Sequence, residues 1–258
     1  MYVVGIDVGS SYSKAVVMDR GRAIISRAMV PLGTGTVGPK KVYEEALMKA
    51  GISKEDVRYT LATGYGRQTF SDADGQRSEI SCHAKGAYFT NPKVRTIIDI
   101  GGQDLKAIRL NDDGAVMNFT MNDKCAAGTG RFLETMAKVL NLNTEDMGRV
   151  GELATEEAEI SNTCTVFAES EVISKLSQNV SIASLVAGIH RSVARRAASL
   201  AFRNRIADDV TISGGVALNQ GVVKALSEEL EREVYVHPDC QYFGAIGAAL
   251  YALEEAER

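Results

Sequence analysis

The sequence predicts an α/β protein built from two similar halves, each opening with three antiparallel strands. Strand-like runs separated by short polar turns begin the chain and return from Arg95 onward. Both openings contain a strand that ends in Asp-x-Gly, at Asp7 and at Asp99. Helical patterns follow in each half. We therefore infer an internal repeat, which is more specific than either turn alone.

In the first half, tight polar turns separate the three opening strands, and this favours an antiparallel meander over a βαβ unit. Pro39 suits the start of a helix, because the first turn needs no N–H from it. The elements expected here are strands over residues 2–7, 15–19 and 23–30, a helix over 39–50, a strand over 57–63 and a helix over 80–89.

In the second half, the same meander precedes two cysteine segments and a set of helices. The elements expected here are strands over residues 96–100, 105–110 and 115–121, a helix over 182–206, a strand over 210–213, a helix over 220–232, a short strand over 233–236 and a final helix from about 241. We expect lobe I to comprise residues 1–94 with 241–258, and lobe II to comprise residues 95–240.

The first turn carries residues suited to phosphate binding. Asp7 and Lys14 flank the small residues Gly9, Ser10 and Ser11, without the G-x-G-x-x-G motif and helix of a dinucleotide fold. Backbone N–H groups of such a turn can surround a phosphate, while the carboxylate orients hydrated Mg²⁺ and the lysine adds positive charge. The alternative is an ordinary hairpin turn with a solvated lysine.

The second turn repeats this arrangement, with Gly101-Gly102-Gln103-Asp104 following Asp99. Asp7 and Asp99 would then both hold Mg²⁺ through water. Farther along, Gly214 and Gly215 follow a strand and would let the backbone approach a ligand closely.

Two cysteines lie at or just before expected helix starts, Cys125 in NDKCAAGTGRF and Cys164 in SNTCTVFAE. A helix N-terminus favours thiolates and other anions. Two thiolates would make half of a four-thiolate metal site, so a complete site would need a second copy of the chain. Packing is the alternative, because there is no C-x-x-C pair and the spacing matches no compact zinc or ferredoxin signature. Cys82 and Cys240 are interpreted as packing residues.

The composition suits a globular protein with one large or two modest domains: 258 residues, 45% hydrophobic and 24% charged. A net charge of −4 gives no attraction to nucleic acid or anionic lipid. No apolar run approaches the roughly 18 residues of a membrane span. The N-terminus lacks the charged region of a signal peptide. We therefore expect a cytoplasmic protein whose four cysteines are reduced or metal-bound.

Together these motifs resemble a known superfamily, that of actin, sugar kinases and heat-shock chaperones. The two carboxylate turns look like its phosphate-one and phosphate-two motifs, and residues 213–217 look like its adenosine motif. Within it, ATGYGR, NDKCAAGTGRF, NTCTVFAESEVIS and ISGGVALN resemble the ATPase activators of 2-hydroxyacyl-CoA dehydratases, to which the ATPase components of benzoyl-CoA reductases are related. The resemblance implies two actin-like (ribonuclease H-like) lobes with mixed sheets and a nucleotide cleft between them.

The resemblance also implies the site residues. It makes Cys125 and Cys164 the ligands of one 4Fe–4S cluster shared across a homodimer. The residues themselves suggest the catalytic set of Asp7, Asp99 and Gln103, with Mg²⁺ held through water by the two aspartates and the attacking water positioned by the glutamine. The residues expected to contact ATP or ADP are Gly9, Ser10, Ser11, Lys14, Gly101, Gly102, Asp104, Gly128, Gly214, Gly215, Val216 and Asn219.

The leading functional hypothesis is ATP hydrolysis coupled to low-potential one-electron transfer, from a ferredoxin or flavodoxin type donor to a partner 2-hydroxyacyl-CoA dehydratase. A benzoyl-CoA reductase type acceptor is the alternative partner. A small-metabolite kinase is a further alternative, which would need a carboxylate base such as Asp104. The third class is a binding module in which four thiolates hold zinc, or no metal, between two copies of the chain.

Overall fold

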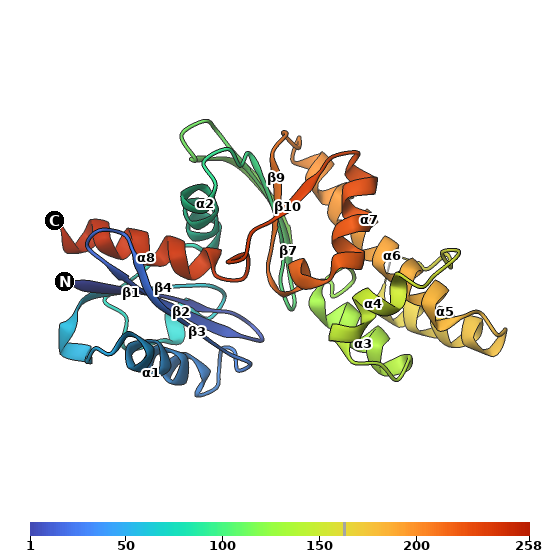
Figure 1. The fold of residues 1–258 in the computed structure, drawn as a ribbon, viewed down its shortest axis with the longest axis horizontal. Coiled ribbons are helices and arrows are strands. Elements are labelled where there is room, and N and C mark those ends of the chain that lie inside the picture. Colours follow the sequence, from blue (N-terminus) through green and yellow to red (C-terminus); the bar gives the residue numbers. More distant parts are fainter. Residues whose placement is uncertain (162–163) are drawn as a thin grey trace. The chain divides into compact units, whose positions relative to one another are not determined.

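The computed structural model describes residues 1–161 and 164–258 (Figure 1). Asn162 and Thr163 of the second cysteine segment lie outside the described residues. The chain divides into two compact units, the first made of Met1–Val94, Leu110–Val116 and Asp239–Arg258, the second of Arg95–Arg109 and Met117–Pro238. Each unit is built on one five-stranded sheet. No helix of the described residues is long and apolar enough to cross a membrane.

The first sheet has the strand order β3-β2-β1-β4-β5. Its strands are β1 (Tyr2–Val8), β2 (Ser13–Asp19), β3 (Ile24–Val30), β4 (Val57–Thr63) and β5 (Gly75–Gln76). The first three are antiparallel neighbours, whereas β4 pairs in parallel with β1 and with β5. The predicted opening meander and mixed sheet are therefore confirmed.

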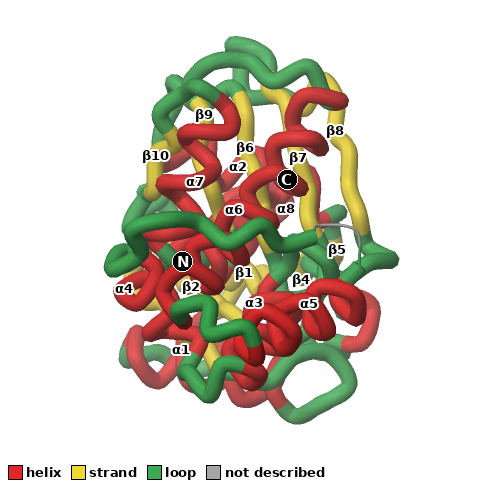
Figure 2. The backbone as a smooth tube through the Cα atoms, turned by 90° about the vertical axis from the view of Figure 1, so that its right-hand side faces the viewer, coloured by secondary structure: helices red, strands yellow, loops and turns green. Residues whose placement is uncertain are grey.

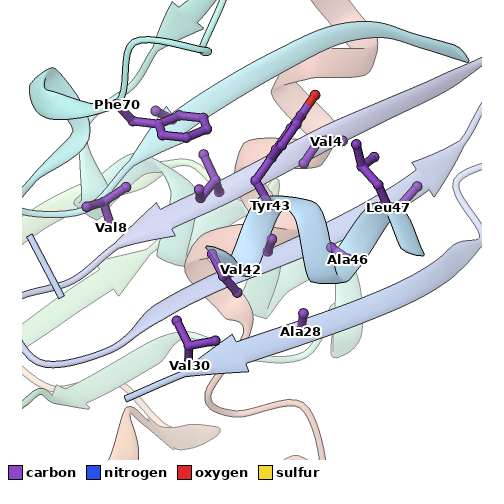
Figure 3. Close-up of a cluster of buried hydrophobic side chains, with 13 residues drawn as sticks. Val4, Val8, Ala28, Val30, Val42, Tyr43, Ala46, Leu47 and Phe70 are labelled. Carbon is purple, nitrogen blue, oxygen red and sulfur yellow. The ribbon is translucent and has the colours of Figure 1, made fainter. Parts of the chain in front are cut away.

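Helices cover both faces of this sheet, because its central strands are apolar on both sides. Helix α1 (Gly38–Ala50) covers one face, where Val42 and Tyr43 belong to the same buried apolar cluster as Val4 (Figure 3). Helices α2 (Glu79–Thr90) and α8 (Phe243–Ala256) lie on the other face. A Cβ on Gly5 would overlap the carbonyl oxygen of Ala245, so glycine lets α8 lie directly against β1.

The second sheet has the order β10-β9-β6-β7-β8, which Figure 2 shows across its width. Its strands are β6 (Thr96–Ile100), β7 (Leu105–Leu110), β8 (Val116–Asn122), β9 (Val210–Ser213) and β10 (Val234–Val236). Strand β6 pairs antiparallel with β7 and parallel with β9, as β1 does with β2 and β4. Both sheets thus have the same strand order, as the internal repeat predicts.

Helix α6 is the longest helix of the second unit and contacts α4, α5 and α7. Small residues and leucine or valine recur along its buried side, which is typical of a helix packed on several neighbours. The helices of this unit are α3 (Gly130–Val139), α4 (Met147–Gly151), α5 (Thr165–Ser177), α6 (Ile182–Arg203) and α7 (Gln220–Leu230). Short 3₁₀ helices lie at Lys54–Asp56, Arg67–Thr69, Thr144–Asp146 and Gly215–Leu218.

His190 of α6 is buried where α4, α6 and α7 meet. A Cβ on Gly151 would come within 2.9 Å of its ring, and one on Gly221 would overlap it. Its Nε2 lies 3.2 Å from Nδ2 of Asn219, which donates to it. Burial lowers the pKa of His190 from 6.5 to about 4. The imidazole is therefore neutral at neutral pH, with Nε2 as its acceptor.

The His190 pKa predicts a pH-dependent stability. The unfolded chain binds the proton near pH 6.5 and the folded chain only near pH 4, so stability present above 6.5 is lost as pH falls between these values. We expect His190→Gln to reduce this loss by up to about 3 kcal/mol in urea unfolding measured across that range. His237→Gln, outside the junction, is the control. Equal pH slopes in wild type and His190→Gln would contradict the prediction.

Candidate nucleotide and thiol sites

The hairpin between β1 and β2 places Asp7 directly opposite Lys14. The Asp7 side chain is buried, and Lys14 Nζ lies 3.6 Å from its Oδ2. The lysine side chain is only 14% exposed, so it is not the solvated lysine of an ordinary hairpin turn. This pair holds one charge of each sign at the end of the hairpin.

The turn of this hairpin contains the other predicted phosphate-binding residues. The N–H of Gly9 donates to the carbonyl oxygen of Tyr12 at 3.0 Å and closes the turn around Ser10 and Ser11. The hydroxyl oxygen of Ser11 is buried and has no hydrogen-bond partner among the described residues. Buried hydroxyls are usually paired. This orphaned group therefore fits a turn that binds a ligand oxygen.

The hairpin between β6 and β7 repeats the pair, with Asp99 opposite Lys106. Both side chains are almost fully buried. Lys106 Nζ lies 3.1 Å from Asp99 Oδ2 and 2.6 Å from Asp104 Oδ2. Lys106 was not predicted from the sequence, although each lysine follows its aspartate at the same spacing in both repeats. Gln103 is exposed in the turn.

The glycine turn after β9 lies beside this second pair. Ser213 is opposite Asp99 in the parallel register, and its Oγ donates to Asp99 Oδ1 at 2.7 Å. Gly214 has φ 86°, and a Cβ there would overlap the carbonyl oxygen of Ile100. The 3₁₀ helix over Gly215–Leu218, which contains Val216, follows directly. Only glycine is therefore suited to this close approach.

Asn219 begins helix α7 and uses both ends of its amide within the protein. Its Oδ1 accepts the N–H of Val222 at 3.1 Å, and its Nδ2 donates to His190. This is the side-chain arrangement of a helix N-cap. The structure therefore gives Asn219 a capping role beside the predicted adenosine motif.

Cys125 and Cys164 both belong to the second unit and are free, partly exposed thiols. Cys164 is the N-cap residue of α5, as the sequence predicted. Cys125 follows β8 and precedes Thr129, the N-cap residue of α3, so it does not lie at the helix start. It lies before the helix, separated from the helix start by a turn in which Gly128 adopts φ 84°. Helices α3 and α5 contact each other, so the helices after the two thiols are neighbours.

The first N–H groups of α3 are bonded to the second hairpin turn. Gly130 N–H donates to the carbonyl oxygen of Gly101, and Arg131 N–H to that of Gly102, each at 2.9 Å. The loop that carries Cys125 is thereby joined by backbone hydrogen bonds to the predicted phosphate-two turn. Gly128 of this loop packs on α6, because a Cβ there would lie 2.7 Å from Cγ of Arg196.

Cys82 and Cys240 are buried in the first unit, as packing residues would be. Cys82 belongs to the cluster of apolar side chains under α8. Burial raises the pKa of Cys82 to about 12, so its thiol stays protonated and is a poor metal ligand.

Known proteins match most or all of the chain. The profile of the BadF/BadG/BcrA/BcrD ATPase family matches residues 4–252. The activator of lactoyl-CoA dehydratase from Anaerotignum propionicum is 57% identical and aligns over 100% of both chains. One of the subunits of benzoyl-CoA reductase from Thauera aromatica is 36% identical, over 85% of this chain and 81% of its own length.

Solved structures agree with this relationship. The activator of the 2-hydroxyisocaproyl-CoA dehydratase from Clostridium difficile, with bound ADPNP, has a TM-score of 0.96 and 50% identity, covering 100% of this chain and 96% of that chain. A ROK family glucokinase from Streptomyces griseus, with TM-score 0.61 and 14% identity over 98% of this chain and 100% of its own, shares the fold alone. The predicted actin-like fold class is confirmed. The chain belongs to the BadF/BadG/BcrA/BcrD ATPase family, which confirms the prediction that it is an ATP-hydrolysing enzyme.

Proposed function

We propose that this protein is a homodimeric iron–sulfur ATPase that couples ATP hydrolysis to one-electron transfer into a partner 2-hydroxyacyl-CoA dehydratase. The names of its relatives support the partner class, since they are activators of lactoyl-CoA, 2-hydroxyisocaproyl-CoA and (R)-2-hydroxyglutaryl-CoA dehydratases. The electron donor in this proposal is a ferredoxin or flavodoxin type protein. The free thiols suit the reducing environment of the cytoplasm, where we place the reaction.

Both hairpins take part in nucleotide binding on this proposal. Asp7 and Asp99 orient hydrated Mg²⁺, while the two hairpin turns and Lys14 contact phosphate oxygens. The adenosine lies against Gly214 and its neighbours. The unpaired Ser11 hydroxyl and the repeated Asp–Lys pair support these roles.

The thiol residues fit half of a four-thiolate cluster. Among the described residues, no group of three or more metal-binding side chains comes together. In this proposal a second copy of the chain supplies the other two thiolates. The buried hydroxyl of Thr165, next to Cys164, has no partner within the described ranges and is suited to donate to sulfur. When bound, a 4Fe–4S cluster supplies one-electron chemistry at low potential.

The surface beside Cys164 fits an interface with another chain. Val166 and Phe167 follow this cysteine at the start of α5 and expose 66% and 69% of their surface. Large apolar side chains are rarely left together in water without a partner. A second copy of the chain, bringing its own two thiols, would cover them.

The coupling of ATP hydrolysis to electron transfer is supported mainly by the backbone hydrogen bonds between α3 and the second hairpin turn. The carbonyl oxygens of Gly101 and Gly102 accept the first N–H groups of the helix that follows the Cys125 loop. Helix α6 adds a second connection, because its Ser192 Oγ donates to the carbonyl oxygen of Ser161 at 3.1 Å, close to Cys164. A change in the turn on ATP hydrolysis therefore moves the supports of the thiols.

A benzoyl-CoA reductase type acceptor is the alternative partner. The 36% identity with the benzoyl-CoA reductase component from Thauera aromatica favours it as the second candidate. The two candidate acceptors catalyse different reactions. Measuring ATP-dependent electron transfer to each purified acceptor therefore distinguishes the two partners.

The thiol assignment predicts the iron content of cysteine variants. Cys125→Ser or Cys164→Ser should abolish iron binding and weaken the dimer, whereas wild type binds about four irons per dimer. Iron analysis, absorbance spectra and gel filtration of anaerobically purified protein measure this. Cys82→Ser and Cys240→Ser are the controls and should keep their iron. Iron retained in Cys164→Ser would refute the assignment, and stoichiometric zinc in wild type would favour a binding module.

The nucleotide assignment predicts different effects for two residues. Asp7→Asn should weaken Mg²⁺·ATP binding and turnover together, because it removes an orienting ligand of the metal. Gln103→Ala should lower kcat by at least about tenfold with little change in ATP affinity, since a water-positioning group acts mainly in the transition state. Asp113→Asn, at an exposed turn, is the charge-matched control. Normal hydrolysis by Gln103→Ala would assign water positioning to another residue.

The coupling predicts that electrons pass to the partner only while ATP is hydrolysed. A nucleotide shifts a conformational equilibrium only through different affinities for its states. An iron chelator should therefore remove iron at different rates from the ATP-analogue and ADP forms. Reduction of the acceptor by a low-potential donor gives the second measurement. Equal transfer with ADP would contradict coupling, and a phosphorylated metabolite would identify a kinase instead.

A further inference from the structure

Lys106 has one of the largest fully buried side chains in the described part of the protein. It lies on β7 with 2% of its surface exposed. Its ammonium donates to Oδ2 of Asp99 at 3.1 Å and to Oδ2 of Asp104 at 2.6 Å. The other oxygen of Asp99 accepts the hydroxyl of Ser213. Both oxygens of Asp99 are therefore fixed by neighbours on two different strands.

This geometry leaves Lys106 poorly suited to bind a ligand directly. A buried ammonium is stable only when carboxylates compensate its charge, and here two share it. The carboxylate of Asp104 lies over the backbone of the β6–β7 turn, because a Cβ on Gly101 would overlap its Oδ1. Lys106 thus ties the end of β6 to the turn on which α3 begins.

Lys14 has the same place in the first hairpin but a different environment. Gly9 and Gly101 close their turns by equivalent hydrogen bonds, to Tyr12 and to Asp104. Tyr12 therefore stands where the second unit has Asp104, so the first hairpin lacks the second carboxylate. Lys14 faces one carboxylate oxygen at 3.6 Å and is 14% exposed, against 2% for Lys106.

We propose that the two repeated lysines have separate tasks: Lys14 contacts the bound ligand, and Lys106 is a positioning residue that fixes Asp99 and Asp104. This inference rests on the proposed function, in which Asp99 orients hydrated Mg²⁺. A fixed carboxylate contributes mainly to turnover, because orientation acts in the transition state. A lysine that binds phosphate contributes to nucleotide affinity as well.

The test compares Lys106→Met with Lys14→Met in the full chain. Lys106→Met should bind a fluorescent ATP analogue within about threefold of wild type while kcat falls by at least about tenfold. Lys14→Met should lose at least about tenfold in affinity for the same analogue. Thermal unfolding and circular dichroism report whether each variant is folded. Equal losses of affinity in both variants, or an unchanged kcat in folded Lys106→Met, would overturn the proposal.

Two further variants keep the test decisive if Lys106→Met does not fold. Lys106→Met combined with Asp104→Asn removes the excess negative charge and should show the same loss of kcat. Asp104→Asn alone keeps the lysine and should lower kcat several-fold; unchanged kcat in this variant would overturn the proposal. The proposed function fails separately, through absence of hydrolysis by wild type, which is measured first.

Discussion

The pairing of an aspartate with a lysine across a hairpin is the interaction on which the rest of this structure depends. It occurs twice, as Asp7 with Lys14 and as Asp99 with Lys106. These side chains are largely buried, and a buried charge without a partner is unfavourable. A shift of one residue in either register would turn the lysine to the opposite face of the sheet. Charge therefore fixes the same strand pairing that the apolar pattern favours.

The two units have the same strand order but differ in the segment that follows the third strand of each meander. In the first, α1 follows β3 and packs its apolar side on the sheet. In the second, the segment after β8 carries Cys125 and leads to α3, which begins on the hairpin turn. The repeat thus gives two similar hairpins. They differ because only the second is hydrogen-bonded to the helix that follows its meander, among the contacts described above.

Much of this fold could be predicted from the sequence, because apolar runs bounded by glycine, aspartate or asparagine define strands clearly. The bounds of β4, β6, β7 and β9 agree with the sequence prediction. The two-residue β5 and the short α4 were missed, since such elements depend on tertiary contacts more than on a periodic pattern. Lys106 was missed because a lysine in a strand usually extends to solvent, and the sequence does not show which carboxylates surround it. The left-handed conformation of Gly128, between Cys125 and α3, is not evident from the sequence, because it depends on the backbone of the folded loop.

The connection between turn and thiol loop follows from the planarity of the peptide bond. The carbonyl of Gly101 shares a rigid plane with the N–H of Gly102, and the carbonyl of Gly102 shares one with the N–H of Gln103. These carbonyls accept N–H groups of Gly130 and Arg131. On the proposed function, the N–H groups of the same peptides face phosphate, so a peptide that turns toward or away from phosphate must also turn its carbonyl. Such a rotation either breaks a backbone hydrogen bond or moves the start of α3.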